Sequence, residues 1–266
     1  MHLGILIDTV SMTLSFEKTQ AMAMYLQLES YNDTLMNGRD LDLGTIRHVA
    51  GKLTWYSEAI QTGRVHVRSW WIYMRYMSEL SVQGKLKLIS DNKWWIAVLK
   101  SWASDSLHGN EYPILSASRL MEEPHLMYVV QSDASGEDGF GYLHGSLQDE
   151  CPRFAASAWG GDYEFGTSHN GELQGLLHFT RTTTERSKVL VWVSDSLSGV
   201  WSVLKGRCKE ERALVTLEAL LQCCDEKKLQ LIALWVPREL NLLPDYLSHL
   251  CAYMNRDQTE GYVDEL

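Results

Sequence analysis

The fold assignment starts from the stretch Val129-Val130-Gln131-Ser132-Asp133-Ala134-Ser135-Gly136-Glu137-Asp138-Gly139-Phe140-Gly141-Tyr142. An apolar run ending at Val130 precedes one carboxylate, a glycine-containing turn and a second apolar run. This pattern predicts a hairpin whose first strand is buried. An ionised Asp133 inside such a strand needs a compensating partner, because burying a charge is costly. The plain alternative is an aspartate at a strand end that bonds its own turn, and carboxylates elsewhere in the chain decide between the two.

Three later carboxylates are candidates to meet Asp133. Glu172 lies in the first turn of a predicted helix, with Ser168 or Asn170 as its N-cap. Asp195 ends the second buried strand, and Asp245 opens a last short helix just after a proline. A strand, a helix start, a strand end and a helix start can all face one point at one edge of a sheet.

Four converging carboxylates repel one another unless cations lie between them. Oxygen ligands of this kind favour Mg²⁺, with Mn²⁺ as a substitute, over zinc. Two such ions about 4 Å apart activate a water and stabilise the leaving oxygen of a phosphodiester. We therefore predict a two-metal hydrolytic site formed by Asp133, Glu172, Asp195 and Asp245.

The order and spacing of these four carboxylates resemble the ribonuclease H domain, in the version found in retroelement reverse transcriptases. The resemblance implies an α/β fold, with a mixed five-stranded sheet and flanking helices over residues 126–252. It also implies that the four residues are catalytic metal ligands and that the substrate is the RNA strand of an RNA–DNA hybrid. Integrases and transposases share this fold, but Glu172 precedes Asp195 here, whereas their last acid is usually a Glu after two Asp.

The first part of the chain carries a more diffuse resemblance. The opening His2 to Asp8, and Val49 to Leu53 continuing through Gly63-Arg64, resemble the primer-grip edge, thumb and connection of reverse transcriptases, most closely in DIRS-type retrotransposons. No Tyr-x-Asp-Asp motif of a polymerase palm occurs. We therefore interpret the chain as a C-terminal portion or a truncated copy, with a missing polymerase half as an expected partner.

The proline distribution suggests the domain boundaries. Pro113 and Pro124 bracket the expected linker, whereas no proline precedes residue 113. We expect a mainly helical thumb/connection-like region over 1–110, a linker over 111–125, a ribonuclease H-like domain over 126–252 and a C-terminal tail over 253–266. Within the first region, apolar spacing predicts a helix over 17–30 capped by Ser15, a turn-rich stretch over 31–40, two helices joined by a turn at Gly63, and a helical run over 94–102.

Charge is unevenly distributed along the chain. The net charge of −10 argues against nucleic-acid binding, but residues 47–100 contain nine Lys and Arg against three Asp and Glu. This stretch also contains several tryptophans, as expected of a surface that follows a phosphate backbone. We propose Lys52, Arg64 and Arg68 as nucleic-acid contacts, and a solvated helical face is the alternative interpretation.

Two rival functions remain open from the sequence. One is an active ribonuclease H, and the other is a non-catalytic nucleic-acid-binding remnant of a reverse transcriptase. His249 is either a substrate contact or an ordinary surface residue, and His169 is either a metal ligand or a residue that orders its loop. The run Leu3 to Ile7 is too short for a signal peptide, and nothing approaches transmembrane length. We expect an intracellular protein, cytoplasmic or nuclear, without a membrane partner.

Overall fold

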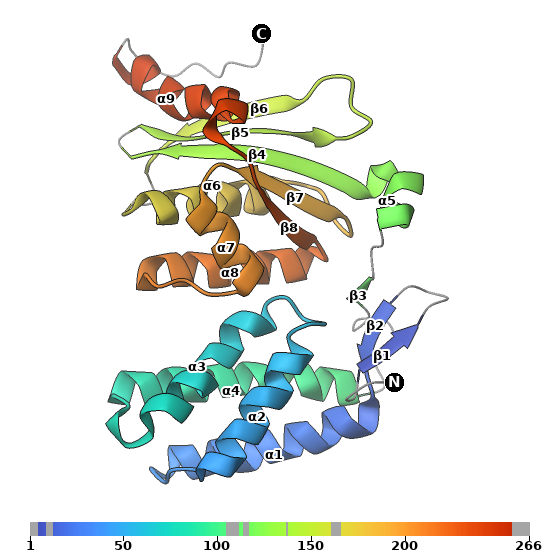
Figure 1. Ribbon diagram of the computed structural model, residues 1–266, viewed down its shortest axis with the longest axis vertical. Coiled ribbons are helices and arrows are strands. Elements are labelled where there is room, and N and C mark those ends of the chain that lie inside the picture. The colour runs from blue at the N-terminus through green and yellow to red at the C-terminus, as the bar shows by residue number, and fades with distance from the viewer. Residues whose placement is uncertain are drawn as a thin grey trace. The chain divides into compact units, whose positions relative to one another are not determined.

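The chain forms two compact units, Met1–Ser116 and Ala117–Leu266, in the computed structural model (Figure 1). The structure describes residues 5–8, 13–104, 112–113, 117–136, 138–160 and 166–256. Among the described residues, no helix combines the length and the apolar character needed to cross a membrane.

The first unit is mainly helical. A small antiparallel sheet has the strand order β1-β2-β3, and most of the core comes from the four helices. Trp70 and Trp95 are the largest fully buried side chains in this unit. The elements are β1 (Ile5–Asp8), β2 (Thr13–Phe16), α1 (Lys18–Met36), α2 (Leu43–Tyr56), α3 (Gly63–Tyr76), η1 (Met77–Glu79), α4 (Val82–Ala103) and β3 (Tyr112–Pro113).

Helix α1 differs from its predicted bounds at both ends. Its N-cap is Glu17 and not Ser15, because the Glu17 carboxylate accepts from the backbone N–H groups of the first turn. The helix also continues to Met36 through the stretch expected to be turn-rich. Buried Asn32 explains the extension, since its side-chain oxygen accepts from Asn92 on α4 at 3.3 Å. This tertiary contact outweighs a local composition typical of turns. The helical run expected over 94–102 likewise begins earlier, at Val82.

The second unit is built on one mixed sheet with the strand order β6-β5-β4-β7-β8. Strands β4, β5 and β6 are antiparallel neighbours, whereas β4 pairs with β7, and β7 with β8, in parallel. This is the ribonuclease H-like arrangement, so the predicted fold class is confirmed. The strands are β4 (Met127–Ser135), β5 (Gly139–Ser146), β6 (Arg153–Ala158), β7 (Val189–Ser194) and β8 (Gln230–Trp235).

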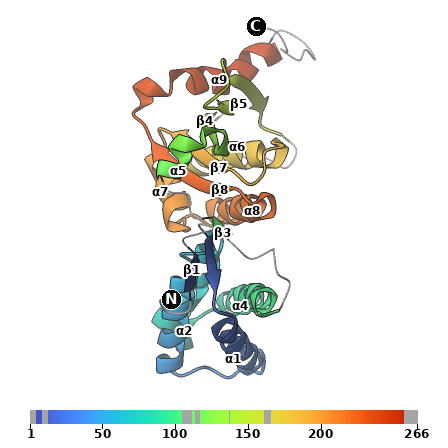
Figure 2. The same cartoon turned by 90° about the vertical axis from the view of Figure 1, so that its right-hand side faces the viewer.

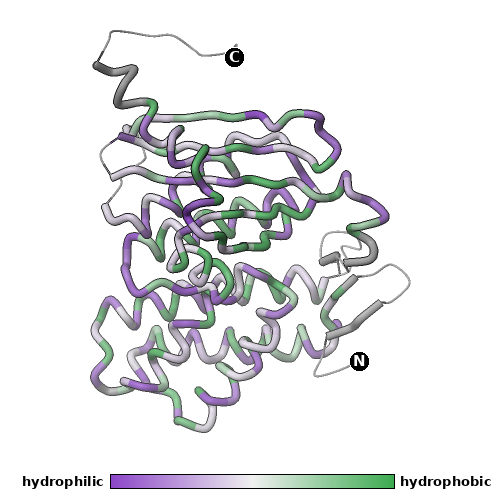
Figure 3. Tube along the Cα trace, turned by 45° about the horizontal axis from the view of Figure 1, so that its top comes forward, coloured by the Kyte–Doolittle hydropathy of each residue, from purple (hydrophilic) through white to green (hydrophobic). Residues whose placement is uncertain are grey.

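Helices cover both faces of this sheet. Helices α6, α7 and α8 lie on one face, and α9 lies on the other, over β4, β5 and β6 (Figures 1 and 2). Hydrophobic residues gather in the central strands between these layers (Figure 3). The helices are α5 (Ala117–Glu122), η2 (Pro124–Leu126), α6 (Ser168–Thr182), α7 (Leu197–Lys205), α8 (Glu211–Lys227), η3 (Arg238–Leu240) and α9 (Leu242–Arg256).

Helix α5 lies within the segment 111–125 expected to be a linker. Two local expectations in this unit need correction. The N-cap of α6 is Thr167, whose hydroxyl accepts from the backbone N–H of Asn170 at 3.2 Å, and neither Ser168 nor Asn170. Helix α9 begins at Leu242 and not at Asp245. Proline is tolerated in the first turn of a helix, where its missing N–H has no intrahelical partner, so Pro244 does not delay the start.

Gly141 allows α9 to rest directly on the sheet. A Cβ atom at Gly141 would lie 2.4 Å from Leu247 Cβ and 2.7 Å from the Ser248 backbone nitrogen, both on α9. Gly141 is also the β5 partner of Asp133 in the β4–β5 register. The close approach therefore fixes the height of α9 above Asp133.

Replacing Gly141 by Ala should lift α9 away from the sheet. We expect the free energy of unfolding to fall by about 1–3 kcal/mol, the usual cost of overpacking, measured by urea denaturation. Gly160→Ala is the matched control, because a Cβ there meets no atom within 4 Å. Equal stability of the two variants would show that the close packing of α9 does not require glycine at position 141.

Candidate metal centre

Three carboxylates from three different elements meet at one edge of the sheet. Asp133 comes from β4, Glu172 from the first turns of α6, and Asp195 from the residue after β7. Each offers one oxygen, and these oxygens all lie within 4.8 Å of one another. Parallel pairing of β4 and β7 explains the meeting of the two aspartates, since it brings the carboxyl ends of both strands to the same edge.

Glu172 is the most deeply buried member of the group, with 4% of its surface exposed. Burial raises its pKa well above the usual value, and the charges of Asp133 and Asp195 raise it further. Hydrogen bonds from the Ala134 backbone N–H and from Ser194 oppose this rise. The Ser194 hydroxyl lies 3.5 Å from Glu172 Oε2, at the long end of hydrogen-bond range. The protein alone therefore leaves the negative charge of this carboxylate poorly compensated.

Asp133 is also buried, with 8% of its surface exposed. Its pKa is raised by burial, and the charges of Asp195 and Asp245 add to the rise. The Ser248 hydroxyl donates to Asp133 Oδ2 at 2.8 Å and, like the nearby Arg238 charge, opposes the rise. Asp133 is thus a strand residue held by a partner on α9, which excludes the alternative of an aspartate bonded only to its own turn.

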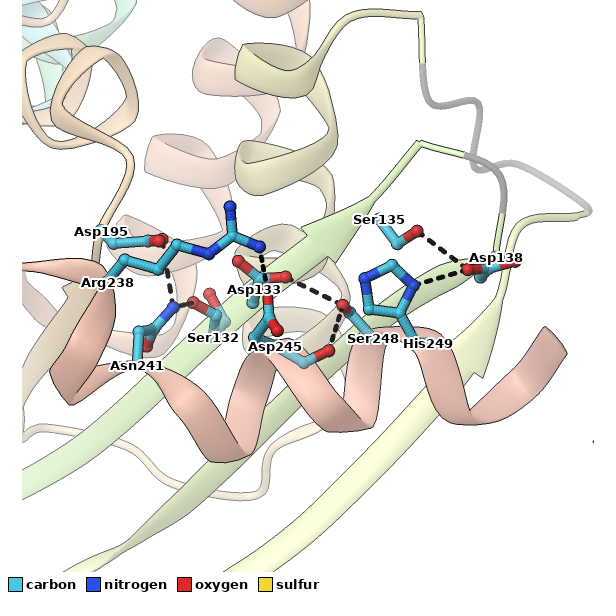
Figure 4. Close-up of polar contacts among 10 residues, drawn as sticks. All are labelled: Ser132, Asp133, Ser135, Asp138, Asp195, Arg238, Asn241, Asp245, Ser248 and His249. Carbon is cyan, nitrogen blue, oxygen red and sulfur yellow. Dashed lines mark hydrogen bonds and ion pairs between the residues drawn. The ribbon is translucent and has the colours of Figure 1, made fainter. Parts of the chain in front are cut away.

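Asp245 lies near the other three but outside their close group. It is in the first turn of α9, with 26% of its side chain exposed. Its Oδ1 accepts from Arg238 Nη2 at 2.7 Å (Figure 4). The structure therefore brings together three of the four predicted ligands and places the fourth in an ion pair at the rim.

Asn241 is a site residue that the sequence did not reveal. It is fully buried, and its amide nitrogen donates to the Ser132 carbonyl and to Asp195 Oδ1, each at 3.1 Å. Its amide oxygen accepts from Gln131 at 2.9 Å. Asn241 thereby joins β4, the end of β7 and the start of α9 (Figure 4). The available signal was an asparagine just before a helix, which is typical of an N-cap.

Ser248 is the second residue missed in the sequence. It lies on α9, three residues after Asp245, and its side chain is fully buried. The Ser248 hydroxyl oxygen also lies 2.8 Å from the backbone carbonyl oxygen of Asp245. A serine in a helix commonly bonds the preceding turn, so nothing in the sequence distinguished it from an ordinary helical serine.

The two candidate histidines have other contacts in the structure. His249 Nδ1 lies 2.7 Å from Asp138 Oδ2 (Figure 4). His169 Nε2 lies 2.9 Å from the Ser202 hydroxyl, and burial lowers the pKa of His169. This contact joins α6 to α7, and the role of His169 as a metal ligand or a loop-ordering residue stays a prediction.

The three predicted nucleic-acid contacts belong to the first unit. Lys52 is on α2, and Arg64 and Arg68 are on α3, all half-buried. Arg64 Nη2 forms an ion pair with Glu58 Oε2 at 3.2 Å, so part of its charge is already compensated. Their role in binding phosphate stays a prediction.

The donor set at the sheet edge fits a hard divalent cation. Its three convergent ligands are all carboxylates, the oxygen ligands that Mg²⁺ and Mn²⁺ prefer. Asp133 and Glu172 are buried and have raised pKa values. A bound cation would relieve the repulsion between the negative charges of the three carboxylates. Asp245 is the candidate fourth ligand, and its charge acts on Asp133.

Solved structures of ribonucleases H resemble this chain over slightly less than half of its length. The N-terminal RNase H domain of rv2228c from Mycobacterium tuberculosis is 18% identical, with a TM-score of 0.37, and the match covers 46% of this chain and 95% of that one. LC11-RNase H1, solved in complex with an RNA/DNA hybrid, is 15% identical with a TM-score of 0.36, covering 48% and 99%. RNase H1 from Halobacterium salinarum NRC-1 is 12% identical with a TM-score of 0.34, covering 46% and 92%. No protein-family model and no curated protein matches the sequence.

The raised pKa of Glu172 predicts how stability depends on pH in EDTA. Between its unfolded and folded pKa values, the folded protein keeps a proton that the unfolded chain releases, so stability falls as pH rises through this window. Glu172→Gln has no such charge. Its stability relative to wild type should therefore increase from pH 4 towards neutral pH, measured by urea denaturation. Exposed Glu226→Gln on α8 is the control, and parallel curves for all three proteins would contradict the burial of a strained charge.

Asn241→Asp should place a second carboxylate against Asp195 and the Ser132 carbonyl. We expect a loss of about 1–3 kcal/mol in the free energy of unfolding at neutral pH, because a buried donor becomes a charged acceptor. Adding Asp195→Asn should restore part of the loss, since the new amide at position 195 can donate to the new carboxylate at position 241. A double-mutant cycle by urea denaturation measures this coupling, and strictly additive effects would show that residues 195 and 241 do not interact.

Proposed function

We propose that the protein is a metal-dependent endonuclease that hydrolyses the RNA strand of RNA–DNA hybrids. The observation that carries this proposal is the meeting of Asp133, Glu172 and Asp195 within 4.8 Å at one edge of a ribonuclease H-like sheet. Holding three mutually repelling carboxylates together, two of them buried, destabilises a fold, so a cation that binds there offers the simplest explanation of their arrangement.

The proposed ligands are these three carboxylates together with Asp245. Two bound Mg²⁺ ions, or Mn²⁺ as a substitute, would supply an activated water and charge stabilisation for the leaving oxygen. The chain itself positions the ligands. Asn241, just before α9, orients Asp195 through one hydrogen bond, and Ser248 on α9 orients Asp133 through another. Glu172 is held by the packing around its buried side chain.

The wider context of the activity is also a proposal. Lys52, Arg64 and Arg68 would bind the phosphate backbone of the hybrid. The resemblance in the first part of the chain supports an origin in a DIRS-like retrotransposon reverse transcriptase, as a thumb/connection-like region ahead of the nuclease. A polymerase half would then be a separate partner, and the setting would be intracellular.

One observation favours a second candidate, a non-catalytic nucleic-acid-binding remnant. Asp245 is paired with Arg238 and stands apart from the other carboxylates. A protein that had lost metal binding would keep such a pair at no cost. The two functions differ in one property, because a remnant binds the hybrid without cutting it.

Cleavage of a labelled RNA–DNA hybrid tests the proposed function. The wild type should cut the RNA strand in Mg²⁺ or Mn²⁺ and not in EDTA. Asp195→Asn keeps an acceptor for Asn241 but removes a ligand charge, and it should lower the cleavage rate at least about 100-fold, the upper cost of losing an outer-shell partner. Glu226→Gln should cut like wild type. Cleavage in EDTA, or full activity of Asp195→Asn, would contradict the metal mechanism, and binding without cleavage by the wild type would favour the remnant.

A further inference from the structure

The ion pair between Arg238 and Asp245 places a protein cation at the carboxylate group. Arg238 Nη2 lies 2.7 Å from Asp245 Oδ1. In Figure 4 the guanidinium lies above Asp133 and Asp245, with Asp195 at the base of the same side chain. Its charge also acts on Asp133, where it opposes the rise in pKa. Arg238 therefore supplies positive charge where the proposed function requires a metal ion.

The backbone that carries Arg238 is firmly held. The Val236 N–H donates to the Ser194 carbonyl at 3.0 Å, and the Asn241 N–H donates to the Arg238 carbonyl at 2.8 Å. Buried Asn241 then anchors the start of α9. The base of the side chain is thus fixed between β8 and α9, next to the ligands.

The guanidinium end, in contrast, is free to change partners. The side chain of Arg238 is 71% exposed, so its ion pair with Asp245 lies in water. Exposed ion pairs are weak and are screened by salt. A divalent cation that binds Asp245 would need the same carboxylate and would repel the guanidinium. The planar fork of an arginine also matches the oxygens of a phosphate.

We propose that Arg238 is a built-in counter-ion that competes with the metal for Asp245 and, once displaced, binds a phosphate of the nucleic acid. This inference rests on the proposed function and deepens it. In the metal-free protein Arg238 partly neutralises the carboxylates. When metal and hybrid bind together, Arg238 exchanges the Asp245 carboxylate for a phosphate, and this exchange links the two binding events.

The two halves of the proposal predict opposite effects of one variant. Arg238→Gln should bind Mg²⁺ more tightly than wild type in the absence of nucleic acid, by about three- to fivefold at low salt, because the competing charge is gone. The same variant should bind an RNA–DNA hybrid more weakly in Ca²⁺. The slope of log affinity against log salt should fall by about 0.9, the value for one phosphate contact on a B-DNA duplex. Calorimetry measures the metal affinity, and a salt titration of hybrid binding measures the slope.

Two further variants make the comparison specific. Arg238→Lys keeps the charge but loses the fork, so its Mg²⁺ affinity should stay near wild type while hybrid binding weakens. Arg186→Gln removes the same charge near the opposite end of β7, where Arg186 bonds the Glu226 carbonyl, and should leave Mg²⁺ affinity unchanged. Thermal unfolding followed by circular dichroism establishes that each variant is folded.

The outcomes separate this inference from the proposed function. Tighter Mg²⁺ binding with weaker hybrid binding in Arg238→Gln supports the exchange. Mg²⁺ binding by the wild type that is unchanged in Arg238→Gln would overturn the competition, and an unchanged salt slope would overturn the transfer to phosphate. Absence of Mg²⁺ binding by the wild type would contradict the proposed function itself.

Discussion

Mutual repulsion among Asp133, Glu172 and Asp195 is the constraint on which the rest of the second unit depends. Two of these carboxylates are buried, and their oxygens lie within 4.8 Å of one another. Such an arrangement persists only when the surrounding fold over-determines it. The sheet supplies that rigidity, because parallel pairing of β4 with β7 places both aspartates at one edge whatever their charge. The helix α6 then carries Glu172 to the same edge.

Helix α9 completes the site from the opposite face of the sheet. Gly141 lets the helix approach β5, Ser248 donates to Asp133, and Asn241 donates to Asp195. Each of these contacts depends on the others, since lifting the helix would break both hydrogen bonds together. The same helix presents Asp245 to Arg238 at the rim. The proposed binding of metal and of nucleic acid would thereby depend on the position of a single helix.

Patterns local in the chain predicted the strands and a convergence of four carboxylates, of which the structure brings three together. Strand β7 is a continuous apolar run with Asp195 at its end, and β4 precedes a glycine turn, so both follow from period and composition. The residues that hold the ligands could not be predicted in this way. Asn241 donates to Asp195, 46 positions away, and Ser248 donates to Asp133, 115 positions away. Their local patterns, an asparagine before a helix and a serine within one, do not identify these partners. Asn32 extended α1 for the same reason, through a partner on another helix.

The central claim is that the buried carboxylates form a cation site. Crystals grown with Mn²⁺ and measured at an X-ray energy where manganese scatters anomalously test it directly. The account predicts an anomalous peak between Asp133, Glu172 and Asp195, with oxygen distances close to the roughly 2.1 Å typical of small hard divalent ions. No peak between these residues, with the three carboxylates unchanged in position, would contradict it.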